Sequence, residues 1–527
     1  MTTDVIANRL TQVALDTVPE TVIKPSYNRQ ALQVGIVHLG MGAFHRAHMA
    51  VYTDTLLNLE GGDWRILGVS LRSPAVRDQL QPQQGLYTVA EMQGDTLSHR
   101  IIGAVADVLV APENPQTVLA AMAAPGCRII SLTITEKGYC HDPASGDLNL
   151  DNAGIRSDLE SCVAAASSTA VDAAPATAIG YLVEALRRRR QAGIEPVTVL
   201  CCDNLPENGS TLKKIVLQFA AQCDPSLADW IAERVPFPNT MVDRIVPATL
   251  DEDIQRLSAE CGYLDKGMVK TEVFTQWVIE DRFAAGRPAW ERAGATLVED
   301  VAPFELAKLR LLNGAHSSLA YLGFIAGYPF VHQVMEDNDF CVYLRGLMLD
   351  EIVPTLSAPP GMDLVQYVDS LLQRFSNASL RHKTYQIAMD GSQKLPQRLL
   401  GTVRDRLQQG APIEHLALAV AGWARYVLGF DARGEVIEVQ DPLVARLQEI
   451  GETHFHNIDD LVENYLNLRE IFDADLAVDE TFKNRVTYWL AHILANGVPT
   501  TLRVFLTEKA SRAANVGNSE SKTEINL

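Results

Sequence analysis

The pattern of apolar residues changes near Pro303, and this change constrains the fold more than any other feature of the sequence. Before that point, short segments rich in β-branched residues alternate with helical segments. The predicted strands are Val34–Leu39, Ile66–Leu71, Arg100–Ala104, Arg128–Thr133 and Thr198–Cys202. Such alternation is typical of a doubly wound α/β domain with a parallel sheet. After Pro303 the helical segments follow one another without strands, so we predict a mainly α-helical second domain.

The length of the chain supports this division. At 527 residues it is too long for one typical hydrophobic core. We expect an α/β domain over residues 1–300 and a helical domain over residues 301–510. Residues 511–527 are polar and lack apolar periodicity, so we expect a disordered tail there.

The charge balance argues against two classes of partner. The chain has 45 Lys and Arg residues against 65 Asp and Glu residues, which gives a net charge of −20. Nucleic acids and anionic membranes bind basic surfaces, so we expect neither as a partner. A small anionic substrate is still compatible with this charge, because a local basic pocket can lie inside an acidic protein.

No segment resembles a membrane span, a signal peptide or a metal site. The apolar runs are shorter than the ~18 residues of a spanning helix, and the N-terminus lacks a basic region followed by an apolar run. The eight cysteines form no C-x-x-C pair and, with the histidines, no zinc pattern. We therefore expect a cytoplasmic protein with reduced thiols and no metal, as a monomer or small homo-oligomer.

A glycine turn follows the first predicted strand. Gly40 and Gly42 lie between Val34–Leu39 and a helical segment that begins near Arg46. In this strand–turn–helix context, a G-x-G sequence places a dinucleotide pyrophosphate at a helix N-terminus. His45 occupies the position of the usual third glycine, so the fingerprint is incomplete. The alternative interpretation is an ordinary glycine turn.

The second predicted strand ends in an unusual way for a dinucleotide site. Arg72 stands where an acidic residue usually binds the ribose hydroxyl. Thr133, after another buried strand, could line the same crevice, although a capped turn is equally compatible. The candidate cofactor-binding residues are Val37, Gly40, Met41, Gly42, Ala43, Phe44, His45, Arg72 and Thr133.

A lysine, an asparagine and a histidine lie along one apolar helical segment. At ~100° per residue, Lys308, Asn313 and His316 fall within an arc of roughly 140°, and Glu305 falls in the same arc. Burying such groups without partners costs several kcal/mol. A buried lysine can have its pKa lowered toward neutrality and act as a base. A surface amphipathic helix with ordinary charges is the equally weighted alternative.

Two more segments carry candidate polar groups. Asn204 follows the strand Thr198–Cys202, and its amide could donate to a substrate oxygen at the carboxyl end of the sheet. Its alternative role is an Asx-type turn cap. Arg381, Gln386 and Lys394 belong to a basic segment that could bind a polyhydroxylated or carboxylated substrate, or could simply be a solvated helix face.

Taken together, these segments resemble the polyol-specific long-chain dehydrogenase/reductase family, which is also called the mannitol dehydrogenase family. The resemblance covers about residues 25–505. It rests on Ile36–His48, Ser131–Tyr139, Cys202–Asn204, Thr240–Pro247, Lys308–His316 and Met389–Arg398. It implies a Rossmann-type N-terminal domain, a helical C-terminal domain, an active site between them, NAD as cofactor and no metal.

The resemblance also implies roles for the candidate residues. Lys308 would be the base, and Asn204 and Asn313 would donate hydrogen bonds to the oxygen at the reacting carbon. His316 would orient the lysine or hold a neighbouring hydroxyl, and Glu305 could relay the proton to water. The substrate's distal hydroxyls or carboxylate would be held by Lys394, Gln386 and Arg381.

Within the family, Thr135–Cys140, Gln276–Asp281 and Tyr385–Arg398 look most like the fructuronate reductase branch. Gln386 stands where mannitol dehydrogenases tend to carry arginine. The expected reaction is therefore NAD-linked interconversion of D-mannonate and D-fructuronate. Mannitol 2-dehydrogenase or a related polyol dehydrogenase is the alternative. A nicotinamide-binding sensor without turnover is a third hypothesis, disfavoured because a sensor need not keep a base and two amide donors.

Overall fold

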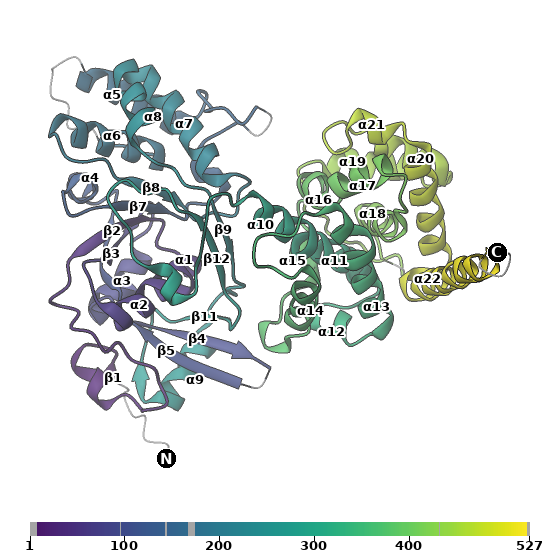
Figure 1. Cartoon of the computed structure of the whole chain (residues 1–527), viewed down its shortest axis with the longest axis horizontal. Coiled ribbons are helices and arrows are strands. Elements are labelled where there is room, and N and C mark those ends of the chain that lie inside the picture. Colours follow the sequence, from purple (N-terminus) through teal and green to yellow (C-terminus); the bar gives the residue numbers. More distant parts are fainter. Residues whose placement is uncertain (1–7, 95, 143–144, 167–173, 432, 524–527) are drawn as a thin grey trace. The chain divides into compact units, whose positions relative to one another are not determined.

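The computed structural model describes residues 8–94, 96–142, 145–166, 174–431 and 433–523. The chain divides into two compact units, Met1–Ala302 and Pro303–Leu527, which are labelled by element in Figure 1. Each unit has its own apolar core and is described by itself.

Unit 1 is built on a five-stranded parallel sheet with the strand order β6-β3-β2-β7-β8. Its strands are β2 (Val34–Leu39), β3 (Arg65–Ser70), β6 (Val105–Val110), β7 (Ile129–Leu132) and β8 (Thr198–Cys201). The order reverses beside β2, because the chain runs outward on one side through β3 and β6 and on the other through β7 and β8. This is the strand order of a Rossmann-type domain.

Unit 1 has nine α-helices among the described residues, several of which cover the two faces of this sheet. Their bounds are α1 (Ala43–Ala47), α2 (Met49–Glu60), α3 (Ala75–Leu80), α4 (Pro115–Ala123), α5 (Ala153–Ala166), α6 (Ala178–Gln191), α7 (Asn208–Cys223), α8 (Pro225–Arg234) and α9 (Asp251–Cys261). Val37 and Ile130 pack in one apolar cluster with α4, α6 and α7, whereas Ile36 and Ile129 pack in another with α2. Successive strand residues point to opposite faces, so both faces are buried. The predicted doubly wound α/β domain is confirmed.

One predicted strand forms, but it belongs to a different sheet from the one expected. Arg100–Ala104 was expected in the alternating sheet, but β5 (Thr96–Ile102) pairs antiparallel with β4 (Tyr87–Gln93) in a separate sheet. The third strand of the parallel sheet in chain order is β6, which begins three residues after β5 ends. The apolar pattern runs on from Ile102 to Val105, so it does not mark the change of sheet.

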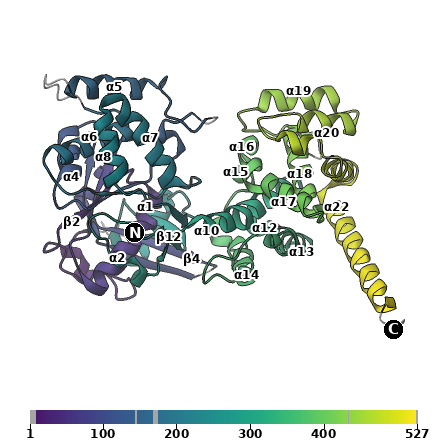
Figure 2. The same cartoon turned by 45° about the horizontal axis from the view of Figure 1, so that its top comes forward.

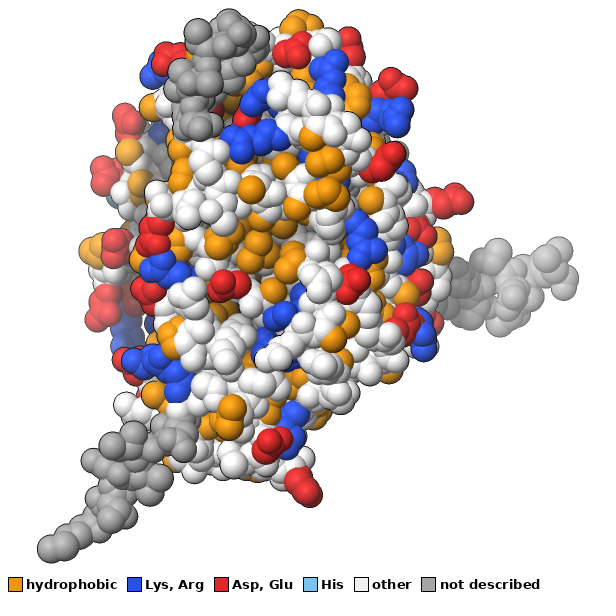
Figure 3. All heavy atoms as spheres, turned by 90° about the vertical axis from the view of Figure 1, so that its left-hand side faces the viewer, with side chains coloured by type: hydrophobic (Ala, Val, Ile, Leu, Met, Phe, Trp, Pro, Cys, Tyr) orange, Lys and Arg blue, Asp and Glu red, His pale blue; other side chains and the backbone are white. Residues whose placement is uncertain are grey.

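Smaller sheets complete unit 1. β11 (Val269–Glu272) lies beside β4, β9 (Thr240–Asp243) and β13 (Thr296–Val298) flank β12 (Gln276–Glu280), and β1 (Asn8–Arg9) pairs with β10 (Tyr263–Leu264). On the face of unit 1 shown in Figure 3, acidic and basic side chains are interspersed around a group of apolar side chains. Charges of both signs therefore share this face.

Unit 2 is helical, as predicted. Its α-helices are α10 (Ala302–Ala307), α11 (Ala315–Ile325), α12 (Val331–Met335), α13 (Asn338–Gly346), α14 (Leu364–Phe375), α15 (Thr384–Ala388), α16 (Gly391–Leu395), α17 (Gly401–Gln408), α18 (Glu414–Val427), α19 (Val444–His454), α20 (Ile458–Leu466), α21 (Ala474–Ala477) and α22 (Glu480–Thr523). Three π-helical segments connect some of them, Lys308–Gly314, Leu347–Ile352 and Pro396–Leu400. Residues Leu416–Val427 of α18 are all buried, so this helix is the centre of the core.

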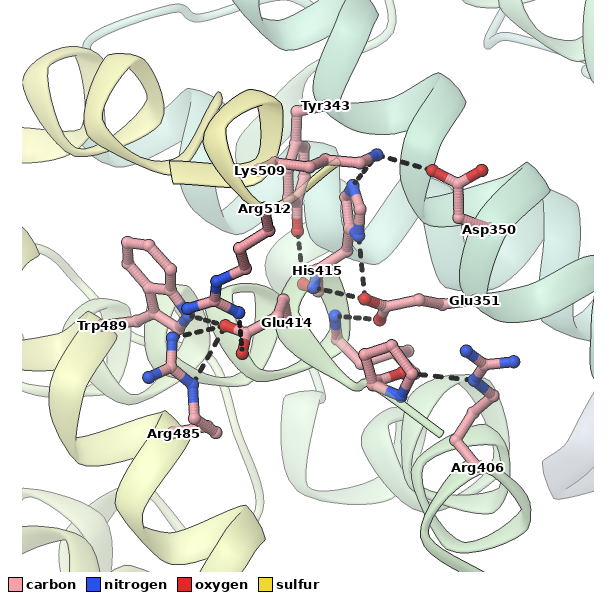
Figure 4. A network of polar contacts seen from close by, with 12 residues as sticks. Tyr343, Asp350, Glu351, Arg406, Glu414, His415, Arg485, Trp489, Lys509 and Arg512 are labelled. Carbon is pink, nitrogen blue, oxygen red and sulfur yellow. Dashed lines mark hydrogen bonds and ion pairs between the residues drawn. The ribbon is translucent and has the colours of Figure 1, made fainter. Parts of the chain in front are cut away.

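A polar network ties α18 to its neighbours (Figure 4). Glu351, in the second π-helical segment, accepts the backbone N–H groups of His415 and Leu416 at the start of α18. The Nδ1 atom of His415 lies 2.8 Å from the same carboxylate, and its Nε2 atom lies 3.2 Å from Nζ of Lys509 on α22. The carboxylate thus satisfies helix-end donors that would otherwise be buried without partners.

Helix α22 bends at Gly497, whose φ of 74° is not helical. Its C-terminal part extends away from the other helices of unit 2 in Figure 2. The helix continues to Thr523, through much of the segment where we predicted a disordered tail, and residues 524–527 lie outside the described residues. A helix that is already formed needs only moderate propensity to propagate. Within the described part of the chain, no helix has the length and apolar character to span a membrane.

Candidate functional site

The glycine turn lies at the carboxyl end of β2, in the crevice where the strand order reverses. Gly40 has a φ of +91°, and a Cβ added to it would come within 2.1 Å of the carbonyl oxygen of Thr133. Gly42 has an ordinary φ of −84°, and a Cβ there would meet only the carbonyl oxygen of Gly40, at 3.8 Å. Gly40 is therefore required by the fold itself, whereas Gly42 leaves open space at the start of α1.

The loops after β2 and β7 are held together at this point. The Oγ1 of Thr133 donates to the carbonyl oxygen of Gly40 at 2.8 Å, and its backbone N–H donates to Leu39 at 3.0 Å. Open doubly wound sheets bind their ligands in this crevice, at the carboxyl ends of the strands. The open backbone at Gly42 is what a pyrophosphate would need.

His45 fills the place of the missing third glycine. Its ring stacks on that of His38 from β2, with centroids 3.4 Å apart and planes 17° apart. Both rings are fully buried, which lowers the pKa of His38 to about 3 and that of His45 well below its usual value. The two rings are therefore neutral near pH 7 and act as packing between β2 and α1.

The other candidate cofactor residues differ in exposure. The side chains of Val37 and Met41 are buried, so only their backbone could contact a ligand. Ala43, Phe44 and Thr133 are half-buried beside the turn. Arg72 is exposed two residues after β3, the strand next to β2. A role for Arg72 in cofactor binding stays a prediction.

Asp203, which directly precedes Asn204, fixes the loop that follows β7. Its carboxylate accepts the backbone N–H groups of Ile134 and Thr135, both at 2.9 Å, and the hydroxyl of Tyr139 at 2.7 Å. Thr135 has a φ of +63°, which is unusual for a β-branched residue and is stabilised by this contact. Asn204 follows as an exposed residue. The role of Asp203 was not predicted, because the residue pattern around it resembles an ordinary strand end.

In unit 2, the segment that carries Lys308 is not a continuous α-helix. Residues Lys308–Gly314 are π-helical, between α10 and α11. A π-helix forms hydrogen bonds between residues five apart, so residues five apart lie nearly one above the other. Lys308 and Asn313 are therefore separated by a smaller angle about the helix axis than the roughly 140° expected for an α-helix. Lys308 is only 8% exposed, and Asn313 and Glu305 are half-buried. The expected α-helical geometry was wrong here, and the actual helix aligns the two groups more closely.

His316 lies on α11 in a strongly basic environment. Its ring stacks on Phe375 at 5.0 Å and meets the edge of His382 at 4.9 Å. Burial and the charges of His382, Arg398, Arg374 and Lys394 lower the pKa of His316 well below its usual value. Its buried Nε2 atom has no hydrogen-bond partner among the described residues. A neutral imidazole with an unused nitrogen can bind a hydroxyl group.

The three predicted substrate residues are placed differently. The charge of Lys394 helps to lower the pKa of His316. Its Nζ atom donates to the carbonyl oxygens of Ile387 at 3.3 Å and Met389 at 2.5 Å. Gln386 is exposed. Arg381 is also exposed, with its guanidinium 5.2 Å from the ring centre of Phe330.

Two arginines of this environment were missed. Arg398 follows Lys394 by four residues, a spacing that puts both on one side of a helical segment and could have revealed it. Arg374 is buried at the end of α14, and it gave no local signal, because its neighbours in sequence form an ordinary amphipathic helix. Among the described residues, no group of three or more His, Cys, Asp or Glu side chains is arranged to hold a metal.

The sequence matches two family models. The mannitol dehydrogenase Rossmann domain matches residues 34–292, and the mannitol dehydrogenase C-terminal domain matches residues 300–494. D-mannonate oxidoreductase of Escherichia coli (strain K12) is 48% identical over 471 residues, which are 88% of this chain and 94% of that protein.

Two solved structures are similar over almost the whole chain. Mannitol 2-dehydrogenase of Pseudomonas fluorescens, in a ternary complex with NAD and D-mannitol, superimposes with a TM-score of 0.82 at 39% identity and covers 95% of this chain and 99% of that chain. A substrate-free D-sorbitol dehydrogenase gives a TM-score of 0.85 at 35% identity and covers 94% of this chain and 100% of that chain.

Proposed function

This chain belongs to the mannitol dehydrogenase family, and we propose that it interconverts D-mannonate and D-fructuronate with NAD. The observation that carries the choice of a sugar acid is the basic environment of His316, to which Arg374, Lys394 and Arg398 contribute in a chain of net charge −20. The similarity to D-mannonate oxidoreductase supports the same substrate. A carboxylate at this site would be attracted by three permanent cations.

The glycine turn of unit 1 would bind the dinucleotide. The open backbone at Gly42 would accept the pyrophosphate, and the loop at Thr133 would lie beside the bound cofactor. When bound there, NAD would supply the hydride acceptor for oxidation of the substrate's secondary alcohol. The ends of β2, β3, β7 and β8 would supply the binding surface.

Lys308 and the groups near it in sequence would transfer the proton of the substrate's hydroxyl group. We propose that Lys308 removes the hydroxyl proton during oxidation and returns it during reduction. Asn204 and Asn313 would donate hydrogen bonds to the developing alkoxide, a contact whose loss typically costs ~10²–10³ in rate. The Nε2 atom of His316 would hold a neighbouring hydroxyl. Glu305, one helical turn before Lys308, would pass the proton to water.

A second candidate is mannitol 2-dehydrogenase, or a related polyol dehydrogenase. It is favoured by the similarity of the whole fold to a mannitol 2-dehydrogenase. Against it stands Gln386, an uncharged and exposed residue in the segment where the family resemblance leads us to expect arginine. Cofactor reduction on mixing with any of these substrates would also exclude a sensor without turnover.

We further propose that the enzyme acts in the cytoplasm as a monomer or small homo-oligomer. All eight cysteines are free thiols, and free thiols are typical of reducing compartments. Size-exclusion chromatography with light scattering would determine the oligomeric state.

We expect kcat/KM for D-mannonate to exceed that for D-mannitol by ~10- to 150-fold. A charge-assisted contact to a carboxylate is worth ~1.5–3 kcal/mol when the transition state retains it. Initial rates with D-mannonate, D-altronate, D-mannitol and D-arabinitol, each with both cofactors, would test this. Equal or better efficiency with D-mannitol would reject the sugar acid and favour the mannitol dehydrogenase hypothesis.

We expect a modest preference for NAD over NADP. The family resemblance favours NAD, but no acidic residue follows β3 to repel a 2′-phosphate, and the exposed Arg72 could attract one. Replacing Arg72 with alanine should lower kcat/KM for NADP by roughly tenfold and leave that for NAD nearly unchanged. A clear preference of the parent enzyme for NADP would contradict the proposed cofactor.

A further inference from the structure

The substrate site of unit 2 has an arginine that is held rigidly beside His316. Arg398 lies in the π-helical segment Pro396–Leu400, which packs against the π-helical segment Lys308–Gly314. A Cβ added to Gly314 would come within 2.7 Å of the carbonyl oxygen of Arg398. The backbone of Arg398 can therefore approach this closely only because residue 314 is glycine.

The side chain of Arg398 is also fixed. Its Nη1 donates to the Oγ of Ser317 at 3.0 Å, and Ser317 directly follows His316 on α11. Ser317 is fully buried, whereas Arg398 is half-buried and therefore partly accessible to solvent.

The positive charge of Arg398 lowers the pKa of His316, and two further cations have the same effect. After burial and the charge of His382, Arg398 is the next largest influence that lowers the pKa of His316, followed by Arg374 and Lys394. The same neutral ring has a buried Nε2 atom without a hydrogen-bond partner in the described chain. A substrate that placed a hydroxyl on this nitrogen would bring its neighbouring atoms toward the cations.

We propose that Arg398, rather than Arg381, is the residue that binds the substrate's carboxylate. The proposal rests on the proposed function and makes its substrate recognition specific. The planar guanidinium of Arg398 can bind a carboxylate through two parallel hydrogen bonds, and its rigid placement reduces the entropy lost on binding. Arg374 and Lys394 strengthen the positive potential without being required to contact the carboxylate.

The contrast with Arg381 follows from its surroundings. Arg381 is exposed and rests over the ring of Phe330, and the charges that act on His316 come from other residues. An exposed guanidinium is screened by water and salt, so its attraction for a carboxylate is weak. Lys394 donates its ammonium hydrogens to backbone carbonyls and lacks the fork geometry that recognises a carboxylate.

The test compares substrate preference among single variants of the full chain. We would measure kcat and KM for D-mannonate and D-mannitol in the parent, Arg398→Gln, Arg398→Lys and Arg381→Gln. Arg446→Gln is the matched control, because Arg446 is an exposed arginine of the same unit that is paired with Glu470. The ratio of the two kcat/KM values within one preparation does not depend on the fraction of folded enzyme.

We expect Arg398→Gln to lower the mannonate-to-mannitol ratio by ~10- to 150-fold, mainly through KM for D-mannonate. Arg398→Lys keeps the charge but not the fork, so it should lower the ratio by a smaller factor. The Arg446→Gln control should keep the parent ratio. If Arg398→Gln proves unable to fold, the same comparison with Arg398→Lys decides the matter.

The outcomes separate this inference from the proposed function. A parent enzyme that prefers D-mannitol overturns both. A parent that prefers D-mannonate, together with an unchanged ratio in Arg398→Gln and Arg398→Lys, overturns only the role of Arg398. A loss of the ratio in Arg381→Gln but not in the Arg398 variants would assign the carboxylate to Arg381 instead.

Discussion

Replacing Lys308 with alanine is expected to lower kcat by a factor of ~10² or more while leaving NAD binding largely intact. The reason is that Lys308 is buried on the π-helical segment that also carries Asn313, whereas the glycine turn that we propose for cofactor binding belongs to unit 1. Stopped-flow measurement of NADH formation and titration with NAD would give the two quantities separately.

The alanine variant needs controls for packing and for charge. Lys308→Met keeps most of the side-chain volume and should be as inactive as Lys308→Ala, because neither side chain can accept a proton. Lys483→Ala removes a lysine of the same unit that is paired with Glu463, away from the candidate site, and should retain parent activity. The residual rate of the Lys308 variants should also lose the pH dependence that a general base imposes. Activity within a few-fold of the parent would reject Lys308 as the base.

Replacing Gly42 with valine is expected to abolish cofactor binding without unfolding the protein. Gly42 has a φ of −84°, and a Cβ there would have only one neighbour within 4 Å, the carbonyl oxygen of Gly40 at 3.8 Å. A valine side chain would therefore be tolerated by the free protein. It would occupy the space where the pyrophosphate must approach the backbone.

Gly40 provides the matched contrast. Gly40→Ala should destabilise unit 1, because its φ of +91° disfavours a side chain and the added Cβ would come 2.1 Å from the carbonyl oxygen of Thr133. Thermal unfolding by circular dichroism and titration with NAD would distinguish the two glycines. A folded Gly42→Val variant with an unchanged NAD titration would contradict the assignment of this turn to the pyrophosphate.

Much of unit 1 could be predicted because its signals are local. The strand Val34–Leu39 and the glycines after it are adjacent in sequence, and the carboxyl ends of parallel strands meet at one edge of a sheet. The same rule placed Thr133 and Asn204 at that edge. It did not reveal that Asp203 holds the loop of Thr135, because that contact joins two loops that are about 70 residues apart in sequence.

The helical unit was less predictable in detail. A period of 3.6 residues correctly indicated helices after Pro303, but it assumes one helix type throughout. The π-helical turn at Lys308–Gly314 changes which side chains align, and no spacing of apolar residues distinguishes it from an α-helical turn. The basic segment around Arg381 was recognised, but the exposed Arg381 and the fixed Arg398 look alike in sequence.

The sequence by itself determined the order of the two domain types, the glycine turn and the candidate base, because these depend on residue types within a few positions of one another. Only the tertiary structure decided which charges share a site. Arg374, Lys394 and Arg398 together lower the pKa of His316, although they come from α14, α16 and the π-helical segment Pro396–Leu400, which are separate in sequence. Their packing depends on long-range contacts, such as the one between Gly314 and Arg398, which local sequence patterns do not encode.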